Sequence, residues 1–260
     1  MDPMDTPRTT SARWLDLAAI GLPLALISAG GMIYCVWPDF YLKYILMPTM
    51  REYQAVEIIT FACSVSAGLV AAVAYRKIFR GRPNDGNAVR RLGPSLIVMS
   101  VCTSSLFLGG EEVNWGQTFM QWGTPLTDVA PETNLHNRDD TIISIQALGS
   151  VYLVGLFFLL PLLWALRKRT KLPDDPSGFS IAIPRWSVVT AAGIAFAWKQ
   201  FKEIYLLVVG KNEARSSVFY NQFMEQLNEQ KEMLFAVALL MLSIQFMVHL
   251  KQQTTPASDK

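Results

Sequence analysis

Six acidic residues and one histidine are concentrated in a single segment, residues 109–140, together with two tryptophans and several amide side chains. Two adjacent carboxylates, Glu111 and Glu112, directly follow an apolar run, and His136 lies further along the same segment. A carboxylate beside an apolar helix pays a desolvation cost, so it needs a partner or a raised pKa. Carboxylates and an imidazole in such a setting can act as general acids and bases or as metal ligands.

The second half of this segment has the spacing of a helix that enters a membrane. Pro131 suits the first turn of a helix, and the Glu132 carboxylate complements the helix dipole there. If the chain is helical from this point, Glu132, His136 and Asp140 follow at i, i+4 and i+8 and share one face. Such groups can bind a divalent metal ion or transfer protons. The candidate cofactor is therefore one divalent metal ion, with Glu112, Glu132 and His136 as its candidate ligands.

The segment also contains the residues that an enzyme would need. The candidate catalytic residues are Glu111, Glu112 and His136, with a glutamate as general base or ligand and the imidazole as acid, base or ligand. The candidate positioning groups are Trp115, Gln117, Asn134 and Asn137. Each residue alone also fits a structural role as a helix cap or a membrane-interface residue. Their crowding in one interfacial stretch favours a functional cluster, because polar groups near lipid are rarely kept without a use.

The elements that must position this cluster are apolar helices. Hydrophobic residues make up 51% of the 260 residues and charged residues only 17%, below the roughly 25% of soluble chains. Long charge-free stretches cover residues 17–38, 58–75, 92–110, 141–166 and 233–250. About 20 apolar residues cross a bilayer as a helix. This pattern predicts a multi-pass membrane protein and excludes a soluble enzyme, a secreted disulfide scaffold, a disordered tail and a nucleic-acid binder.

The predicted fold class is all-α, a polytopic membrane helix bundle of about six transmembrane helices with amphipathic interfacial segments. We expect a tail at residues 1–13, one transmembrane domain at 14–250 that includes an outer loop at 111–140, and a disordered tail at 251–260. Pro161 is expected to kink the fourth helix. The fifth span is expected to begin near Arg185 and to be interrupted by Lys199, Lys202 and Glu203. An amphipathic helix at residues 217–232 should lead into the sixth span at 233–250.

The basic residues predict the orientation. With six crossings and the N-terminus in the cytoplasm, the inside segments hold 15 of the 23 Lys and Arg residues. This distribution obeys the positive-inside rule and places both termini in the cytoplasm. Arg8 and Arg13 precede the first apolar run as in a signal peptide, but the run is long and has no small-x-small cleavage site, so we expect an uncleaved helix.

The stretch EEVNWGQTFMQWGTP followed by PETNLHN resembles the signature EExxWGQ…ETNLHN of a family of uncharacterised bacterial multi-pass membrane proteins. The resemblance covers about 30 of the 260 residues and brings no assigned activity with it. It implies that the matching residues form the shared core of the family: Glu111, Glu112, Trp115, Gly116, Gln117, Glu132, Asn134, Leu135, His136 and Asn137. It also implies a bacterial inner membrane as the location.

Other constellations do not fit the sequence. The EExxxR motif of CAAX-type intramembrane proteases needs further histidine motifs, and this chain has only two histidines. Its second histidine, His249, is expected at the opposite, cytoplasmic end of the bundle. Rhomboid-type catalysis lacks its GxSG, and a dinuclear carboxylate site lacks its two Glu-x-x-His motifs. Glu225, Glu229 and Glu232 share a helical face that is best interpreted as solvated, and Lys202 is a candidate to neutralise the carboxylates of the cluster.

Three functions remain open from the sequence. The first is a membrane-embedded hydrolase or transferase that acts on a lipid-type substrate, such as a lipid-linked molecule, at the extracytoplasmic interface. The alternative is a scaffold or complex subunit that binds other membrane proteins, with the motif as a structural clasp. A transporter ranks third, because the five long spans carry no ionisable residue at their centres. The lipid bilayer is the expected partner, and no nucleic-acid partner is expected.

Overall fold

The computed structural model describes residues 10–41, 55–80, 88–112, 145–169, 179–210 and 227–254, together with Glu213, Ser217, Phe219 and Tyr220. Nearly all of these residues are helical, and none of them lies in a strand. The α-helices are α1 (Thr10–Val36), α2 (Pro38–Phe40), α3 (Ala55–Arg80), α4 (Ala88–Glu112), α6 (Ile145–Val154), α7 (Leu160–Arg169), α8 (Trp186–Val209) and α10 (Leu227–Thr254). The π-helical turn η3 (Gly155–Leu159) connects α6 to α7, and the 3-10 turn η4 (Phe179–Ala182) precedes α8. Six spans are long and apolar enough to cross a membrane. The predicted all-α membrane bundle is confirmed.

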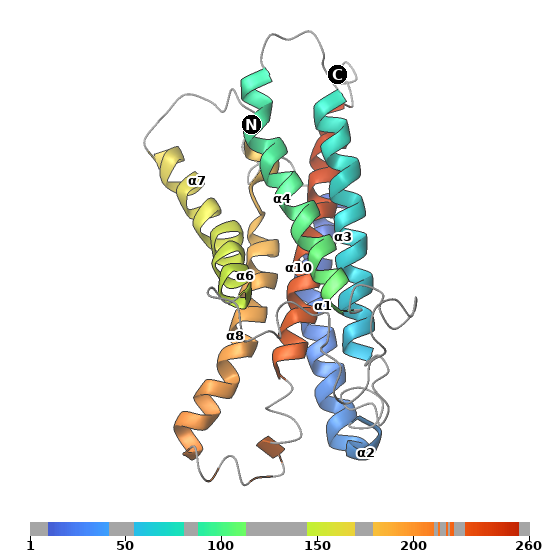
Figure 1. The fold of residues 1–260 in the computed structure, drawn as a ribbon, viewed down its shortest axis with the longest axis vertical. Helices are drawn as coiled ribbons and strands as arrows, with labels where there is room; N and C mark the ends of the chain where they lie inside the picture. The colour runs from blue at the N-terminus through green and yellow to red at the C-terminus, as the bar shows by residue number, and fades with distance from the viewer. Residues whose placement is uncertain are drawn as a thin grey trace, which may run out of the picture.

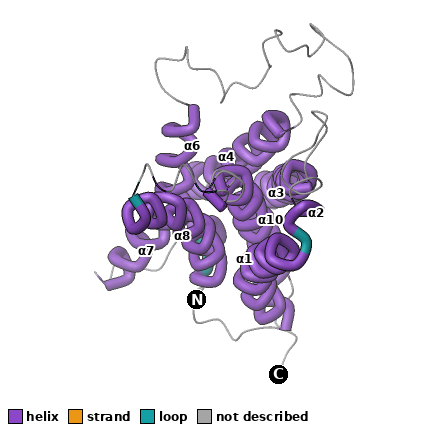
Figure 2. Tube along the Cα trace, turned by 90° about the horizontal axis from the view of Figure 1, so that it is seen from below, coloured by secondary structure: helices purple, strands orange, loops and turns teal. Residues whose placement is uncertain are grey.

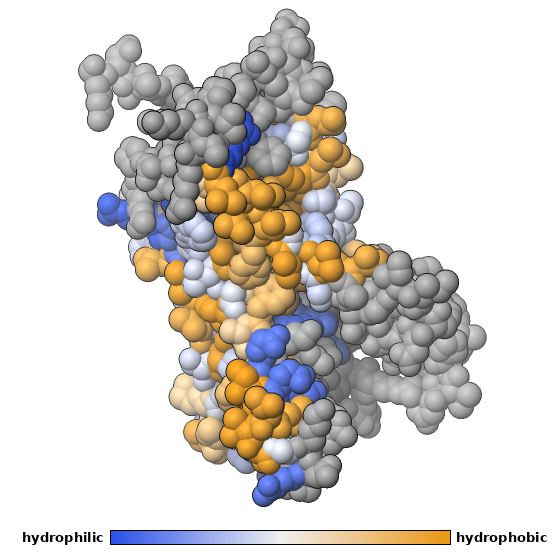
Figure 3. All heavy atoms as spheres, turned by 90° about the vertical axis from the view of Figure 1, so that its left-hand side faces the viewer, coloured by the Kyte–Doolittle hydropathy of each residue, from blue (hydrophilic) through white to orange (hydrophobic). Residues whose placement is uncertain are grey.

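The core of the bundle is α10, which α1, α3, α4 and α8 surround (Figures 1 and 2). In its most apolar 18-residue window 72% of the residues are buried, against 11% in α1. Large apolar side chains on the outer helices point away from the core instead; Leu207 is 85% exposed and Val151 is 71% exposed. Figure 3 shows apolar side chains along the face on the α7 and α8 side. A helix that is apolar on its outer face suits contact with lipid.

Small residues let α3 approach its neighbours closely. Its buried positions recur at helical spacing and carry short side chains: Thr60, Ser64, Ala67, Ala71 and Ala74. A Cβ atom added to Gly68 would lie 2.6 Å from the Leu106 side chain of α4, and one added to Gly109 would lie 3.3 Å from Ser64 Cβ. Membrane helices lack a hydrophobic drive to associate, so close backbone approach through small residues supplies van der Waals packing instead.

The fourth span is distorted one turn before Pro161. The chain is α-helical in α6, π-helical over Gly155–Leu159 and α-helical again in α7. Because Pro161 has no N–H, the ordinary helical hydrogen bond is lost there, and a wider turn is one way to accommodate the loss. Phe158 from this turn stacks edge-on against Phe196 of α8, which stacks in turn on Phe235 of α10. The turn therefore aims an aromatic side chain at the core.

Several predicted boundaries differ from the structure. The predicted interruption of the fifth span at Lys199, Lys202 and Glu203 is wrong, because α8 is one unbroken helix from Trp186 to Val209. A lysine near a helix end can extend its charged tip toward the interface while its backbone stays helical. The sixth span belongs to a helix that begins at Leu227 and continues to Thr254, so the start of the expected disordered tail is helical.

Candidate functional site

Of the sequence-predicted site, the structure describes only the backbone of Glu111 and Glu112 in α4. Glu111 and Glu112 are the last two residues of that helix. Their side chains lie outside the described residues, as do all the other predicted site residues: Trp115, Gln117, Glu132, Asn134, His136 and Asn137. The expected contact between a glutamate of α4 and His136 therefore stays a prediction. We call the end of the bundle at which α4 ends, and at which α3 and α10 begin, the motif end.

Glu112, the last described residue of α4, lies deeper in the bundle than the first described residue of α3. Gly109 packs against Ser64 and Val65 of the antiparallel helix α3. Ala55, the first described residue of α3, is nine residues before Ser64, whereas Glu112 is three residues after Gly109. At 1.5 Å per residue, the six-residue difference leaves Glu112 roughly 9 Å short of Ala55 along the helices. Figure 1 shows the same arrangement, with α4 ending above the lower ends of α1 and α8.

A buried polar network joins three helices at the motif end. Gln230 of α10 donates from Nε2 to the Tyr41 hydroxyl at 2.7 Å and accepts at Oε1 from Trp198 Nε1 of α8 at 2.9 Å. Tyr41 is only 1% exposed, so its ring belongs to the core of the bundle. Burial raises the pKa of Tyr41 to about 12, partly offset by the Gln230 hydrogen bond. The phenol is therefore neutral and fixes the chain beyond α1 to the core.

Aromatic rings extend this network toward α8. Tyr34 lies 5.4 Å from Tyr41 and 6.1 Å from Phe219, measured between ring centroids. The Lys202 ammonium lies 5.7 Å from the centre of the Tyr220 ring, a cation–π contact. Lys202, the candidate to neutralise the motif carboxylates, is thus held at the motif end by an aromatic face.

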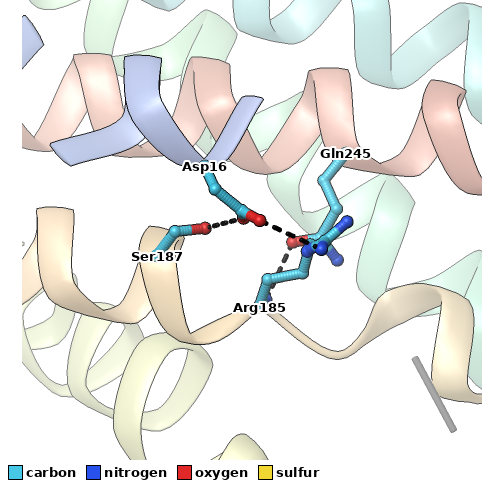
Figure 4. Close-up of polar contacts among 4 residues, drawn as sticks. All are labelled: Asp16, Arg185, Ser187 and Gln245. Atoms are coloured by element: carbon cyan, nitrogen blue, oxygen red, sulfur yellow. Dashed lines mark hydrogen bonds and ion pairs between the residues drawn. The ribbon is translucent and has the colours of Figure 1, made fainter. Parts of the chain in front are cut away.

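The opposite end, where the described chain begins and ends, holds an ion pair that joins α1 to α8. Arg185 Nη2 donates to Asp16 Oδ2 at 3.1 Å, and Ser187 Oγ donates to Asp16 Oδ1 at 2.5 Å (Figure 4). The two charged side chains are 11% and 22% exposed. Because both lie within spans apolar enough to cross a membrane, pairing is the way for them to avoid the cost of an isolated charge.

Gln245 of α10 supports the same region through backbone contacts. Residues 183–185 are not helical, and Ile183 is 1% exposed. Gln245 Nε2 donates to the Ile183 carbonyl at 2.7 Å, and its Oε1 accepts from the Arg185 N–H at 2.8 Å. Non-helical backbone is tolerated at membrane depth only where protein groups satisfy it. Gln245 therefore allows the chain to enter the bundle in extended form before α8 begins.

His249 lies one turn beyond Gln245 on α10 and is 8% exposed. Neither ring nitrogen has a hydrogen-bond partner among the described residues. Gln245, one turn earlier on the same face of α10, bonds to Ile183 and Arg185, so the imidazole lies beside the chain that leads into α8. The expected separation of His249 from the motif end agrees with its position beside the Asp16–Arg185 pair.

Sequence reasoning missed these two polar clusters. Asp16 stood just outside the charge-free run that defined the first helix, and Gln230 and Gln245 are uncharged, so none attracted notice. A usable signal existed: a carboxylate at the start of an apolar helix needs a cationic partner, and Arg185 stands at the start of another. Transport ranked low because the five long charge-free spans carry no central ionisable residue; the continuity of α8 adds a further span, which contains Lys202 and Glu203.

Among the described residues, no group of three or more His, Cys, Asp and Glu side chains could hold a metal ion. The side chains of the candidate ligands Glu112, Glu132 and His136 lie outside the described residues, so a metal site there stays a prediction. No protein-family model, curated protein or solved structure matches this chain.

Proposed function

We propose that this integral membrane protein is a membrane-embedded hydrolase or transferase that acts on a lipid-type substrate at the extracytoplasmic interface. Glu111 or Glu112 serves as general base or metal ligand, and His136 as acid, base or ligand. The observation that carries the proposal is the depth of Glu112, which lies below Ala55 of the neighbouring helix α3. The packing of Gly109 against Ser64 fixes this depth.

The depth of Glu112 matters because it changes what a carboxylate can do. A carboxylate that lies below the end of a neighbouring helix would be partly removed from water, which would favour its protonated form and make it a stronger base. A lipid substrate approaches such a group sideways from the bilayer, without leaving the hydrocarbon phase. The buried network of Tyr41, Gln230 and Trp198 stiffens the same end of the bundle.

The second candidate function is a scaffold or complex subunit in which the motif is a structural clasp. The described polar contacts favour it, because they join one helix to another: Asp16 to Arg185 and Gln230 to Tyr41. In this view the motif carboxylates hold the segment after α4 to the bundle in the same way. Transport ranks third and draws support from ionisable groups within apolar spans, such as Lys202 in α8.

Two substitutions separate the enzyme from the clasp: Glu112→Gln and His136→Asn, each measured for melting temperature, bound divalent metal and a cellular phenotype. A catalytic or ligating group is replaced at little cost to folding, so we expect the phenotype to be lost with an unchanged or raised melting temperature. Glu203→Gln, an exposed carboxylate on α8, is the matched control and should change neither.

The clasp makes the opposite forecast. Removing one partner of a buried polar contact leaves the other unsatisfied at about 1–3 kcal/mol. Marked destabilisation by both substitutions, with the phenotype lost in proportion, would overturn the enzyme proposal. Bound metal that disappears in both variants while the fold is kept would identify the metal-site form of the proposal.

A further inference from the structure

Hydrogen-bond donors outnumber acceptors around the start of α8. Both carboxylate oxygens of Asp16 are occupied, one by Ser187 and the other by Arg185. A guanidinium group has five N–H donors. Within the described part of the chain, one hydrogen bond from the Arg185 side chain is made, to Asp16. The remaining donors lie in a side chain that is only 11% exposed.

His249 adds a second group without a partner. Its ring is more than nine-tenths buried, and both nitrogens lack a hydrogen bond to any described residue. Gln245, one turn earlier on the same face of α10, accepts from the Arg185 N–H, so the ring lies beside the start of α8. Buried polar groups are normally satisfied, so this imidazole indicates a partner from outside the described residues.

The first turn of α8 supplies further positive potential. No side chain caps this helix, because its N-cap residue is Arg185, whose side chain has no acceptor. The first N–H groups of a helix have no partner within it, and they carry the positive end of its dipole. Anions bind at such helix starts for both reasons.

We propose that Arg185, His249 and the first turn of α8 form a binding site for a phosphate group. A phosphate presents several oxygens at once, and the planar guanidinium fork can bind two of them. The same end of the bundle carries the exposed cationic residues Arg13, Arg76, Lys77 and Lys251. These charges raise the local concentration of anions. The phosphate belongs either to a phospholipid headgroup or to a free phosphate ion.

The test is binding to the purified full chain in detergent. Melting temperature and native mass spectrometry are measured with inorganic phosphate, with phosphatidic acid, and with diacylglycerol, which has the same tails but no phosphate. We expect stabilisation by a phosphate-bearing probe and none by diacylglycerol. In His249→Leu and Arg185→Lys the affinity should fall about tenfold or more, the size expected for one charge-assisted hydrogen bond.

The variants are chosen to fold. His249→Leu removes no described hydrogen bond, and Arg185→Lys keeps a cation for Asp16. Thr190→Val, which removes an exposed hydroxyl one turn further into α8, should leave the affinity unchanged. A response to phosphatidic acid alone assigns the site to a headgroup, and a response to inorganic phosphate assigns it to the free ion. No response in the unmodified protein, or an equal response in His249→Leu, overturns the proposal.

Discussion

At the scale of single residues, the Gln245 side chain supplies two hydrogen bonds that a helical backbone would otherwise have made. The peptide groups of Ile183 and Arg185 have no helical partners, and this one side chain satisfies a carbonyl and an N–H. Replacing Gln245 with Leu keeps a side chain of similar size but leaves the Ile183 carbonyl and the Arg185 N–H buried and unpaired. We expect a loss of about 2–4 kcal/mol in the free energy of unfolding, measured by denaturant titration in detergent micelles.

A matched control is available on α8. The Thr190 hydroxyl is exposed and bonds within its own helix, to the Trp186 carbonyl. Thr190→Val should therefore change stability by less than about 0.5 kcal/mol. If Gln245→Leu is as harmless as Thr190→Val, the role assigned to Gln245 is wrong.

Tyr41 makes a second residue-scale prediction, which concerns alkaline pH. Its pKa is raised from 10.0 to about 12 in the folded protein, chiefly by burial. The unfolded chain therefore loses the phenolic proton first. The contribution of Tyr41 to the free energy of unfolding is fully present below about pH 10. It falls by on the order of 2–3 kcal/mol as the pH rises to about 12. The measurement is the free energy of unfolding against pH, compared with Tyr41→Phe, in which this part of the decline should vanish. Parallel curves for the two proteins would contradict the prediction.

The residue scale is also where the sequence was least informative. Glu111, Glu112 and His136 attracted attention because charge beside an apolar run is visible in one dimension. Tyr41 and Gln230 are 189 positions apart, and nothing in either local pattern indicates their hydrogen bond. Neutral side chains become functional or structural in a membrane through partners on other helices, and single-sequence reasoning does not see such pairings.

At the scale of elements, the contact of α3 with α4 depends on Gly68. A Cβ atom added at this position would lie 2.6 Å from both Cγ and Cδ2 of Leu106. We expect Gly68→Ala to destabilise the protein by about 1–3 kcal/mol through overpacking. Adding Leu106→Ala should restore part of that loss by making room, so the double-mutant cycle should show a coupling of at least about 0.5 kcal/mol.

Gly193 is the control for this prediction. It lies in the middle of α8, and a Cβ atom there would meet nothing within 4 Å. Gly193→Ala should be neutral or stabilising by up to about 1 kcal/mol, because alanine is the better helix former. Equal effects of alanine at Gly68 and Gly193 would show that the close approach of α3 and α4 is not required.

The elements themselves were largely predictable, since hydropathy follows directly from what lipid tolerates. All six spans were expected, and six are found. The error at α8 arose because Lys202 and Glu203 were weighed as interruptions, although the backbone hydrogen bonds of a helix do not depend on the side chains that it carries. The π-helical turn at Gly155–Leu159 was anticipated only as a kink at Pro161, since the sequence shows the lost N–H but not how the backbone adapts.

At the scale of the whole molecule, the ion pair of Asp16 with Arg185 ties the start of α1 to the start of α8. The even number of spans and this contact both place the start of the chain, the connection before α8 and the end of α10 at one end of the bundle (Figure 1). The basic residues favour the cytoplasm for that end. We therefore expect reporter fusions at Asn84 and Gly178 to report the cytoplasm and a fusion at Thr127 to report the outside.

This topology decides where the proposed chemistry takes place. Thr127 lies in the segment that carries His136, so an outside signal places the motif at the extracytoplasmic surface, where lipid-linked substrates of that leaflet are accessible. Asn84 and Gly178 act as controls for each other, because Asn84 lies in sequence between α3 and α4 and Gly178 between α7 and α8, and both pairs of helices meet these connections at the same end of the bundle. A cytoplasmic signal at Thr127 with outside signals at the other two would show the opposite orientation in the membrane. The six-span bundle would be kept, but the proposed substrate in the outer leaflet would be contradicted. A cytoplasmic signal at all three would contradict the bundle itself, since α4 would then fail to cross.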